Sequence, residues 1–113
     1  MADVTYLLGS NPYHVAELER TALSDDYTPA NWTYSLVMKK LGEAFDGATE
    51  TWVAAAYELA TDSEGETHHT VKALLTDLIT VRGQYTTYVR LVNAASEAET
   101  PQYIPVSGIA TVK

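Results

Sequence analysis

Alternation of apolar and polar residues is the clearest pattern in the chain, and it is strictest over residues 32–40. Four apolar residues occupy every second position there: Trp32, Tyr34, Leu36 and Met38. Successive side chains of a β-strand point to opposite faces, so this row places aromatic and aliphatic groups on one side. The pattern predicts a strand whose apolar face lies in the core.

The last third of the chain has the features of a β-hairpin. Residues 84–92 alternate in the same way, and residues 104–112 are rich in β-branched side chains but carry Pro105 and Gly108. Proline and glycine at these positions suit an edge strand with a bend or bulge. The polar segment 93–100 is the expected loop. Strands are therefore predicted near residues 32–40, 71–76, 84–92 and 104–112, with the last two paired.

Three segments support both a helical and an extended interpretation. Residues 69–79 place leucines and a valine at helical spacing, and residues 50–60 contain three consecutive alanines, which favour helices. Residues 13–23 follow Asn11-Pro12, a plausible helix start. Intrinsic propensity alone would give an α+β fold, whereas the tyrosines, valines and threonines of the whole chain favour a sheet.

Composition narrows the class of protein. With 113 residues the chain is expected to form one domain, and its net charge of −8 repels the phosphate backbone of nucleic acids. Cysteine is absent, so neither disulfides nor thiolate chemistry are available. The first residues do not resemble a signal peptide, and no apolar run is long enough for a membrane helix. We therefore expect neither a nucleic-acid nor a membrane partner.

The second half of the chain resembles a family of small immunoglobulin-like virion proteins of tailed phages of actinobacteria, which are distantly similar to the N-terminal domains of phage baseplate proteins. The residues that carry the resemblance are Trp52, Ala55, Tyr57, Leu74-Leu75, Gly83-Gln84-Tyr85, Tyr88 to Val92, Glu99-Thr100-Pro101, Ile104-Pro105-Val106, Gly108 and Thr111-Val112, with Trp32 as the tryptophan of an earlier strand. The resemblance implies a mainly β fold, an immunoglobulin-like antiparallel β-sandwich that can include one short helix. It also implies extended structure at Trp52 and Leu74 despite their helical character.

Candidate chemistry is sparse. His68 and His69 are neighbours, and adjacent residues of a strand point to opposite faces, so they do not form a metal site together; His14 is distant in sequence. The acidic loop 62–66 lacks the ligand spacing of a calcium loop. No nucleophile elbow or phosphate-binding glycine loop occurs. We expect no catalytic, cofactor or metal site, and we interpret the chain as a non-enzyme.

Aromatic and apolar residues remain to be assigned to the core or to a binding surface. Trp32, Tyr34, Trp52 and Tyr85 are expected in the core, since aromatics bury large areas. Residues 1–12 are interpreted as an N-terminal arm outside a single sandwich domain formed by residues 13–113. Peripheral tyrosines, which include Tyr27, suit interfaces. The predicted partner-binding residues are Val4, Tyr6, Leu7, Leu8 and Tyr103.

The function that these expectations favour is a phage virion structural protein, made in the host cytoplasm, that decorates the capsid or joins head to tail. Its partners would be capsid or connector proteins, and it would occur as a homo-oligomer within the assembly. Two alternatives stay open: an adhesion or carbohydrate-binding sandwich, in which an exposed aromatic stacks on sugar rings, and a small α+β enzyme or regulatory subunit.

Overall fold

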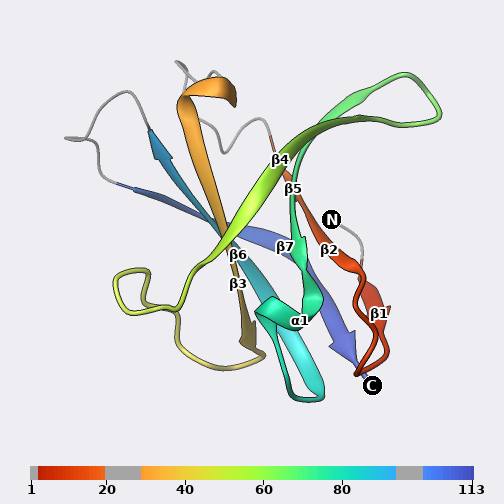
Figure 1. The fold of residues 1–113 in the computed structure, drawn as a ribbon, viewed down its shortest axis with the longest axis vertical. Coiled ribbons are helices and arrows are strands. Elements are labelled where there is room, and N and C mark those ends of the chain that lie inside the picture. The colour runs from red at the N-terminus through yellow and green to blue at the C-terminus, as the bar shows by residue number, and fades with distance from the viewer. Residues whose placement is uncertain (1–2, 20–28, 94–100) are drawn as a thin grey trace.

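The computed structural model describes residues 3–19, 29–93 and 101–113, and these residues form a seven-stranded sheet (Figure 1). The strands are β1 (Val4–Tyr6), β2 (Tyr13–Leu18), β3 (Trp32–Lys40), β4 (Val53–Thr61), β5 (Thr67–Leu74), β6 (Gly83–Asn93) and β7 (Gln102–Val112). A short helix, α1 (Leu75–Leu78), follows β5, and a 3-10 turn, η2 (Pro29–Asn31), precedes β3.

The strand order β1-β7-β6-β3-β4-β5-β2 curls into a half-barrel of two facing layers. Strand β4 makes the corner, because residues 53–55 pair with β3 and residues 56–61 pair with β5. The prediction of a mainly β, sandwich-like fold is thus confirmed, although the two layers are continuous through β4. One pair is parallel, β1 with β7, so the sheet is not antiparallel throughout.

The strands expected from alternation are present. The prediction at residues 32–40 matches β3, and the predicted strands 84–92 and 104–112 lie within β6 and β7. These last two pair antiparallel, from Gly83 opposite Val112 to Leu91 opposite Gln102, so the predicted hairpin is confirmed. Residues 94–100 of its loop lie outside the described residues. The predicted strand 71–76 is right only up to Leu74, because α1 begins at the next residue.

The helical interpretation of the three ambiguous segments is wrong for most of their described residues. Strand β4 contains the three alanines, β5 contains the start of the 69–79 segment, and β2 occupies residues 13–18. Each segment hydrogen-bonds to a neighbouring strand, and this tertiary pairing outweighs local helix propensity. Within the described residues the one α-helix is four residues long, which removes the α+β alternative. Residues 20–23 lie outside the described part, as does Tyr27.

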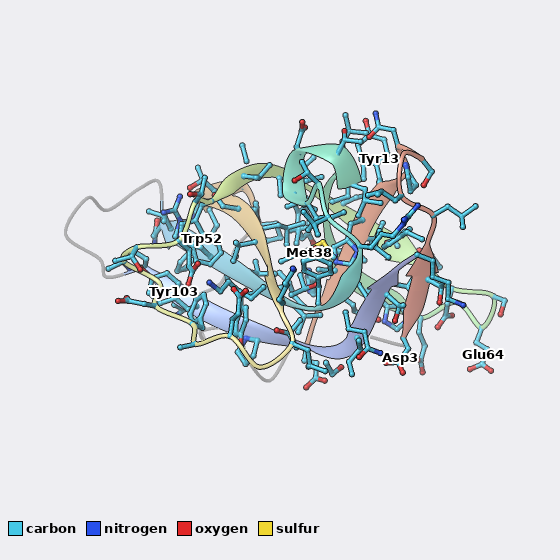
Figure 2. All side chains as sticks on the ribbon, turned by 90° about the horizontal axis from the view of Figure 1, so that it is seen from below. Asp3, Tyr13, Met38, Trp52, Glu64 and Tyr103 are labelled. Atoms are coloured by element: carbon cyan, nitrogen blue, oxygen red, sulfur yellow. The ribbon has the colours of Figure 1, made fainter. Side chains whose placement is uncertain are left out.

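The core occupies the space between the two layers. The larger cluster of buried residues comprises Ala16, Leu18, Trp32, Tyr34, Leu36, Val71, Ala73, Val89, Leu91, Ile104 and Val106. A second cluster comprises Met38, which lies near the middle of the molecule in Figure 2, and Leu75, Ile79, Tyr85, Ala110 and Val112. The core positions predicted for Trp32, Tyr34 and Tyr85 are confirmed. The core position predicted for Trp52 is wrong, because its indole is half-buried on the outer face among other aromatic rings.

A hydrogen bond at the start of β6 fixes the corner that precedes this strand. The hydroxyl of buried Tyr85 donates to the backbone carbonyl of Val81, four residues upstream. Burial raises the pKa of Tyr85, so the phenol stays protonated and keeps its donor.

The N-terminal segment does not form the free arm that the sequence suggested. Residues Val4–Tyr6 make β1, which pairs with β7 through Val4 opposite Ala110 and Tyr6 opposite Val112. Val4 and Tyr6 are partly buried against the second core cluster. A parallel edge strand has no sequence pattern of its own at three residues, and its partner is about a hundred residues away, which is why local reasoning missed it.

Candidate interaction surfaces

The end of β1 presents two leucines to solvent from a rigid base. The Lys113 amide donates to the Tyr6 carbonyl (2.9 Å) and the Leu8 amide donates to the Lys113 carbonyl (2.7 Å), so the chain stays paired with the C-terminus beyond β1. The Ser10 amide and hydroxyl both donate to the Leu7 carbonyl and close a tight turn. Within this turn the Leu7 side chain is 68% exposed. An apolar side chain held out by backbone hydrogen bonds is suited to contact with another molecule.

An apolar cavity of about 270 Å³ lies directly beside these leucines. It is lined by Leu8, Gly9, Ser10, Leu75, Thr76, Ile79 and Thr80. Two of its walls therefore come from segments far apart in sequence, the turn after β1 and the α1 region. The Thr76 hydroxyl donates to the Asn11 side-chain carbonyl (2.8 Å) and ties the two walls together. We refer to Leu7, Leu8 and this cavity as the apolar end.

A buried histidine contacts the strand that leads into the apolar end. The His14 imidazole is fully buried, with Nδ1 2.8 Å from the Tyr6 hydroxyl and Nε2 2.8 Å from the Thr87 hydroxyl. These contacts join β1, β2 and β6. Burial lowers the pKa of His14 to about 4, so the ring is neutral at physiological pH. One ring nitrogen then donates and the other accepts, which fits two hydroxyl partners.

Tyr103 lies at the opposite end of the molecule, next to Trp52 (Figure 2). Its ring stacks on Trp52 with centroids 5.7 Å apart, and Phe45 packs edge-on to both rings. Phe45 in turn stacks on Tyr88 at 4.0 Å, and the Arg90 guanidinium lies 5.1 Å from the Trp52 ring centre. We call these five residues the aromatic cluster.

A glycine allows the loop before β4 to close over this cluster. A Cβ atom built on Gly47 would lie 2.5 Å from Cζ of Tyr103, so only a residue without a side chain fits against the ring. The Trp52 indole N–H donates to the Gly47 carbonyl (3.0 Å) and fixes the loop. Tyr103 remains 39% exposed, so the aromatic cluster is a packed outer layer with one accessible ring.

His68 joins two acidic residues near the β4–β5 turn. Its ring donates to Glu17 (2.6 Å) and to Asp62 (2.9 Å). The bond to Asp62, and then the bond to Glu17, raises the pKa of His68, and the same histidine is the largest cause that lowers the pKa of Asp62. Asp62, Glu66 and His68 place one ligand atom each within 4.8 Å of one another.

This acidic group has an evident structural role. One oxygen of Asp62 accepts the backbone amides of Glu64 and Glu66, and Gly65 supplies the positive φ that the turn requires. The carboxylate thus closes the hairpin, and His68 holds it against β2. A hairpin clasp accounts for all of these contacts, and we assign no cation to the exposed cluster.

The structure brings four of the five predicted partner-binding residues together and separates the fifth. Leu7 and Leu8 form the exposed part, whereas Val4 and Tyr6 lie beneath them as strand residues. Tyr103 belongs to the aromatic cluster. Their binding of a partner stays a prediction. Sequence reasoning missed Leu75, Ile79 and Phe45 as surface residues, and the apolar spacing of residues 71–78 was a local signal for Leu75 alone.

Comparison with known proteins adds no relative: no protein-family model matches the chain, and no curated protein is similar to it. Among the described residues, no helix has the length and apolar character to cross a membrane.

Proposed function

We propose that this chain is a non-catalytic structural protein of a phage virion, which decorates the capsid or connects head to tail by binding other proteins. Capsid or connector subunits are the intended partners, and many copies act within one assembly. The observation that carries the proposal is the apolar end. Two leucines at a rigid turn beside an apolar cavity offer a partner both a protruding group and a recess.

The energetics favour an interface of this kind. Contact at Leu7 and in the cavity would remove apolar surface from water at about 25 cal/mol per Å². The turn is already ordered by three hydrogen bonds to Lys113 and Leu7, so binding costs little further conformational entropy. A small contribution per copy becomes large when many copies bind one particle.

The immunoglobulin-like sandwich and the residues that resemble actinobacterial phage virion proteins support the virion context. The acidic 62–66 turn, whose residues are all exposed, would face solvent and keep the outer surface soluble. The test is co-sedimentation of the purified protein with particles of the phage that encodes it. Saturable binding supports the proposal, and particles that contain no copy of the chain by mass spectrometry contradict it.

Carbohydrate recognition by the aromatic cluster is the second candidate, favoured by the accessible ring of Tyr103. Sugar stacking requires a free aromatic face, and here Trp52 stacks on Tyr103 while Phe45 stacks on Tyr88. The faces of these rings are therefore largely occupied by one another, and we rank this function below protein binding. A glycan array bound by the wild type and not by Tyr103→Ala would reverse that ranking.

A further inference from the structure

The outer edge of β2 is unpaired within the described residues, since β2 ends the strand order of the sheet. The Leu75 amide donates to the Pro12 carbonyl (2.9 Å), and Tyr13 lies opposite Leu74. Pro12 and Leu75 therefore form a hydrogen-bonded pair, and the next pair, Tyr13 with Leu74, is a non-hydrogen-bonded pair. In such a pair the amide and carbonyl of Tyr13 point away from β5. Directions alternate along a strand, so the backbone groups of Val15 and Glu17 point the same way. Three amides and three carbonyls thus face outward.

The opposite edge of the sheet is protected, in contrast. Strand β1 is only three residues long, and the Asp3 carboxylate beyond it accepts the Ile109 amide of β7 (2.8 Å). Pro105 stands on β7 opposite Tyr88. The Leu41 amide donates to the Gln84 carbonyl, and by alternation the backbone groups of Tyr88 point to β3. Pro105 therefore removes the amide that would have faced outward from β7.

Short strands and edge prolines are the usual devices that prevent a sheet edge from pairing with another chain. β2 has neither within its six residues. Its outward backbone groups at Tyr13, Val15 and Glu17 form a regular row. The difference between the two edges identifies β2 as the one that is open to an added strand.

Side chains around this edge indicate the chemistry of an added strand. On the outer face Tyr13 is 54% and Val15 44% exposed. A cleft of about 80 Å³ beside the edge is lined by Glu17 and Glu19 and, from β7, by Ile104, Pro105, Val106 and Ser107. An incoming strand meets apolar side chains from β7 and two carboxylates, that of Glu17 on β2 and that of Glu19 just after β2. A second copy of this chain, with its net charge of −8, is less complementary to these carboxylates than a basic segment.

We propose that the free edge of β2 binds an extended segment of a partner protein as an additional strand. The segment carries apolar side chains over the cleft and a lysine or arginine against Glu19, beside Glu17, whose carboxylate already accepts from His68. Main-chain hydrogen bonds to Tyr13, Val15 and Glu17 supply affinity, and the charges supply selectivity, as in other cases of strand addition. This surface is separate from the apolar end, so the two proposals fail independently.

The test uses the purified full chain and a synthetic peptide that alternates valine with lysine and threonine. Hydrogen exchange followed by NMR should show the amides of Tyr13, Val15 and Glu17 slowed about tenfold or more at saturating peptide. A matched peptide with glutamate in place of lysine should bind about tenfold more weakly. Unchanged exchange at all three amides, or equal binding of the glutamate peptide, overturns the proposal.

Val15→Pro is the selective variant, because it removes an amide that has no partner inside the described sheet. It should abolish peptide binding, whereas Val15→Ala, which keeps the amide, should bind like the wild type. A thermal melt verifies that the proline variant is folded, and Tyr13→Pro repeats the experiment at the next outward position. Sedimentation of the protein alone gives the remaining outcome. If the protein alone forms a dimer that Val15→Pro dissociates, the edge of β2 binds a second copy of this chain. That result would overturn the proposal of a partner protein's strand.

Discussion

The Tyr6 hydroxyl lies 2.8 Å from Nδ1 of His14, and this bond joins the first two strands across a completely buried ring. Tyr6 lies in β1 and His14 in β2, eight positions later, yet the two strands belong to opposite layers of the half-barrel. The ring planes are nearly perpendicular, at 78°. Strand β1 leads into the turn with Leu7 and Leu8. Protonation of His14 would therefore weaken the contact that holds β1, and with it the apolar end, in place.

Folding stability should fall as pH decreases below about 6.5. The folded protein keeps His14 neutral down to about pH 4, whereas the unfolded chain takes up a proton near 6.5. The stability associated with the depressed pKa is present above 6.5 and is lost as pH falls toward 4. The loss amounts to about 3 kcal/mol. Urea denaturation at pH 7 and pH 4.5 measures it, and His14→Gln should flatten the dependence.

His68 acts in the opposite direction and provides the control. Its pKa is raised by Asp62 and Glu17, so its contribution is present below 6.5 and is lost as pH rises through the folded pKa. His68→Gln should therefore leave the acid-side loss intact or steeper. A pH profile that His68→Gln flattens and His14→Gln leaves unchanged would contradict the assignment to the buried ring.

Tyr85→Phe should destabilise the protein by about 1 kcal/mol, because the hydrogen bond from the buried Tyr85 side chain to the Val81 carbonyl is lost. Tyr88→Phe is the matched control. It lies on the same strand, and its ring stacks on Phe45 without a hydrogen bond from its hydroxyl to a described residue. Chemical denaturation of the two variants checks this. Equal losses would argue against a specific role of the corner bond.

The two tryptophans should respond differently to truncation. Trp32→Ala empties a space between the layers and should cost about 3–5 kcal/mol, enough to unfold a marginal domain. Trp52→Ala removes a half-buried ring from the aromatic cluster and should cost about 1–3 kcal/mol. Melting temperatures of both variants give the order. A larger loss for Trp52 would mean that the outer cluster, and not the interlayer core, dominates stability.

Gly47→Ala should displace Tyr103 from Trp52. The new methyl group would occupy the position of the tyrosine ring, and the side chain of Tyr103 can rotate away more easily than the loop can move. We expect a weakened near-ultraviolet circular dichroism signal with a small loss of stability, about 1 kcal/mol. In a Tyr103→Ala background the same substitution should be nearly neutral. Additive losses from the two substitutions would show that they do not share a contact.

Much of the sheet was predictable because its central strands are periodic. Apolar residues alternate from Trp32 to Met38 within the nine-residue strand β3, which pairs with β6 along its whole length, and the hairpin of β6 and β7 is local in sequence. The alanines of β4 misled a reading by propensity, since the corner strand owes its conformation to β3 and β5 and not to its own residues. A lone tryptophan outside an alternating row, Trp52, gave no signal of which face it occupies.

The candidate surfaces were predictable only in part, because their other members are distant in sequence. Leu7 and Leu8 are conspicuous as an apolar run, and they are exposed. The wall of the cavity at Leu75 and Ile79 is nearly seventy residues away, and the Thr87 partner of His14 is 73 residues away. Such pairs arise from strand order. The open edge of β2 has the same origin, since exposure of its backbone depends on which strand is missing beside it.

Deletion of the first eight residues would not separate an effect on binding from an effect on stability, because β1 belongs to the sheet. Single substitutions of the exposed leucines avoid this difficulty. Leu7→Ser changes a side chain that is 68% exposed, and Leu59→Ser, on β4, is a matched control at 52% exposure. The free energy of unfolding of both variants should lie within about 0.5 kcal/mol of the wild-type value.

Co-sedimentation of these two variants with phage particles is the most direct test of the apolar end as the partner-binding surface. We predict that Leu7→Ser, alone or with Leu8→Ser, lowers particle binding about tenfold or more, whereas Leu59→Ser binds like the wild type. Binding by the Leu7→Ser/Leu8→Ser protein that equals the wild type, with the fold intact, would contradict the account.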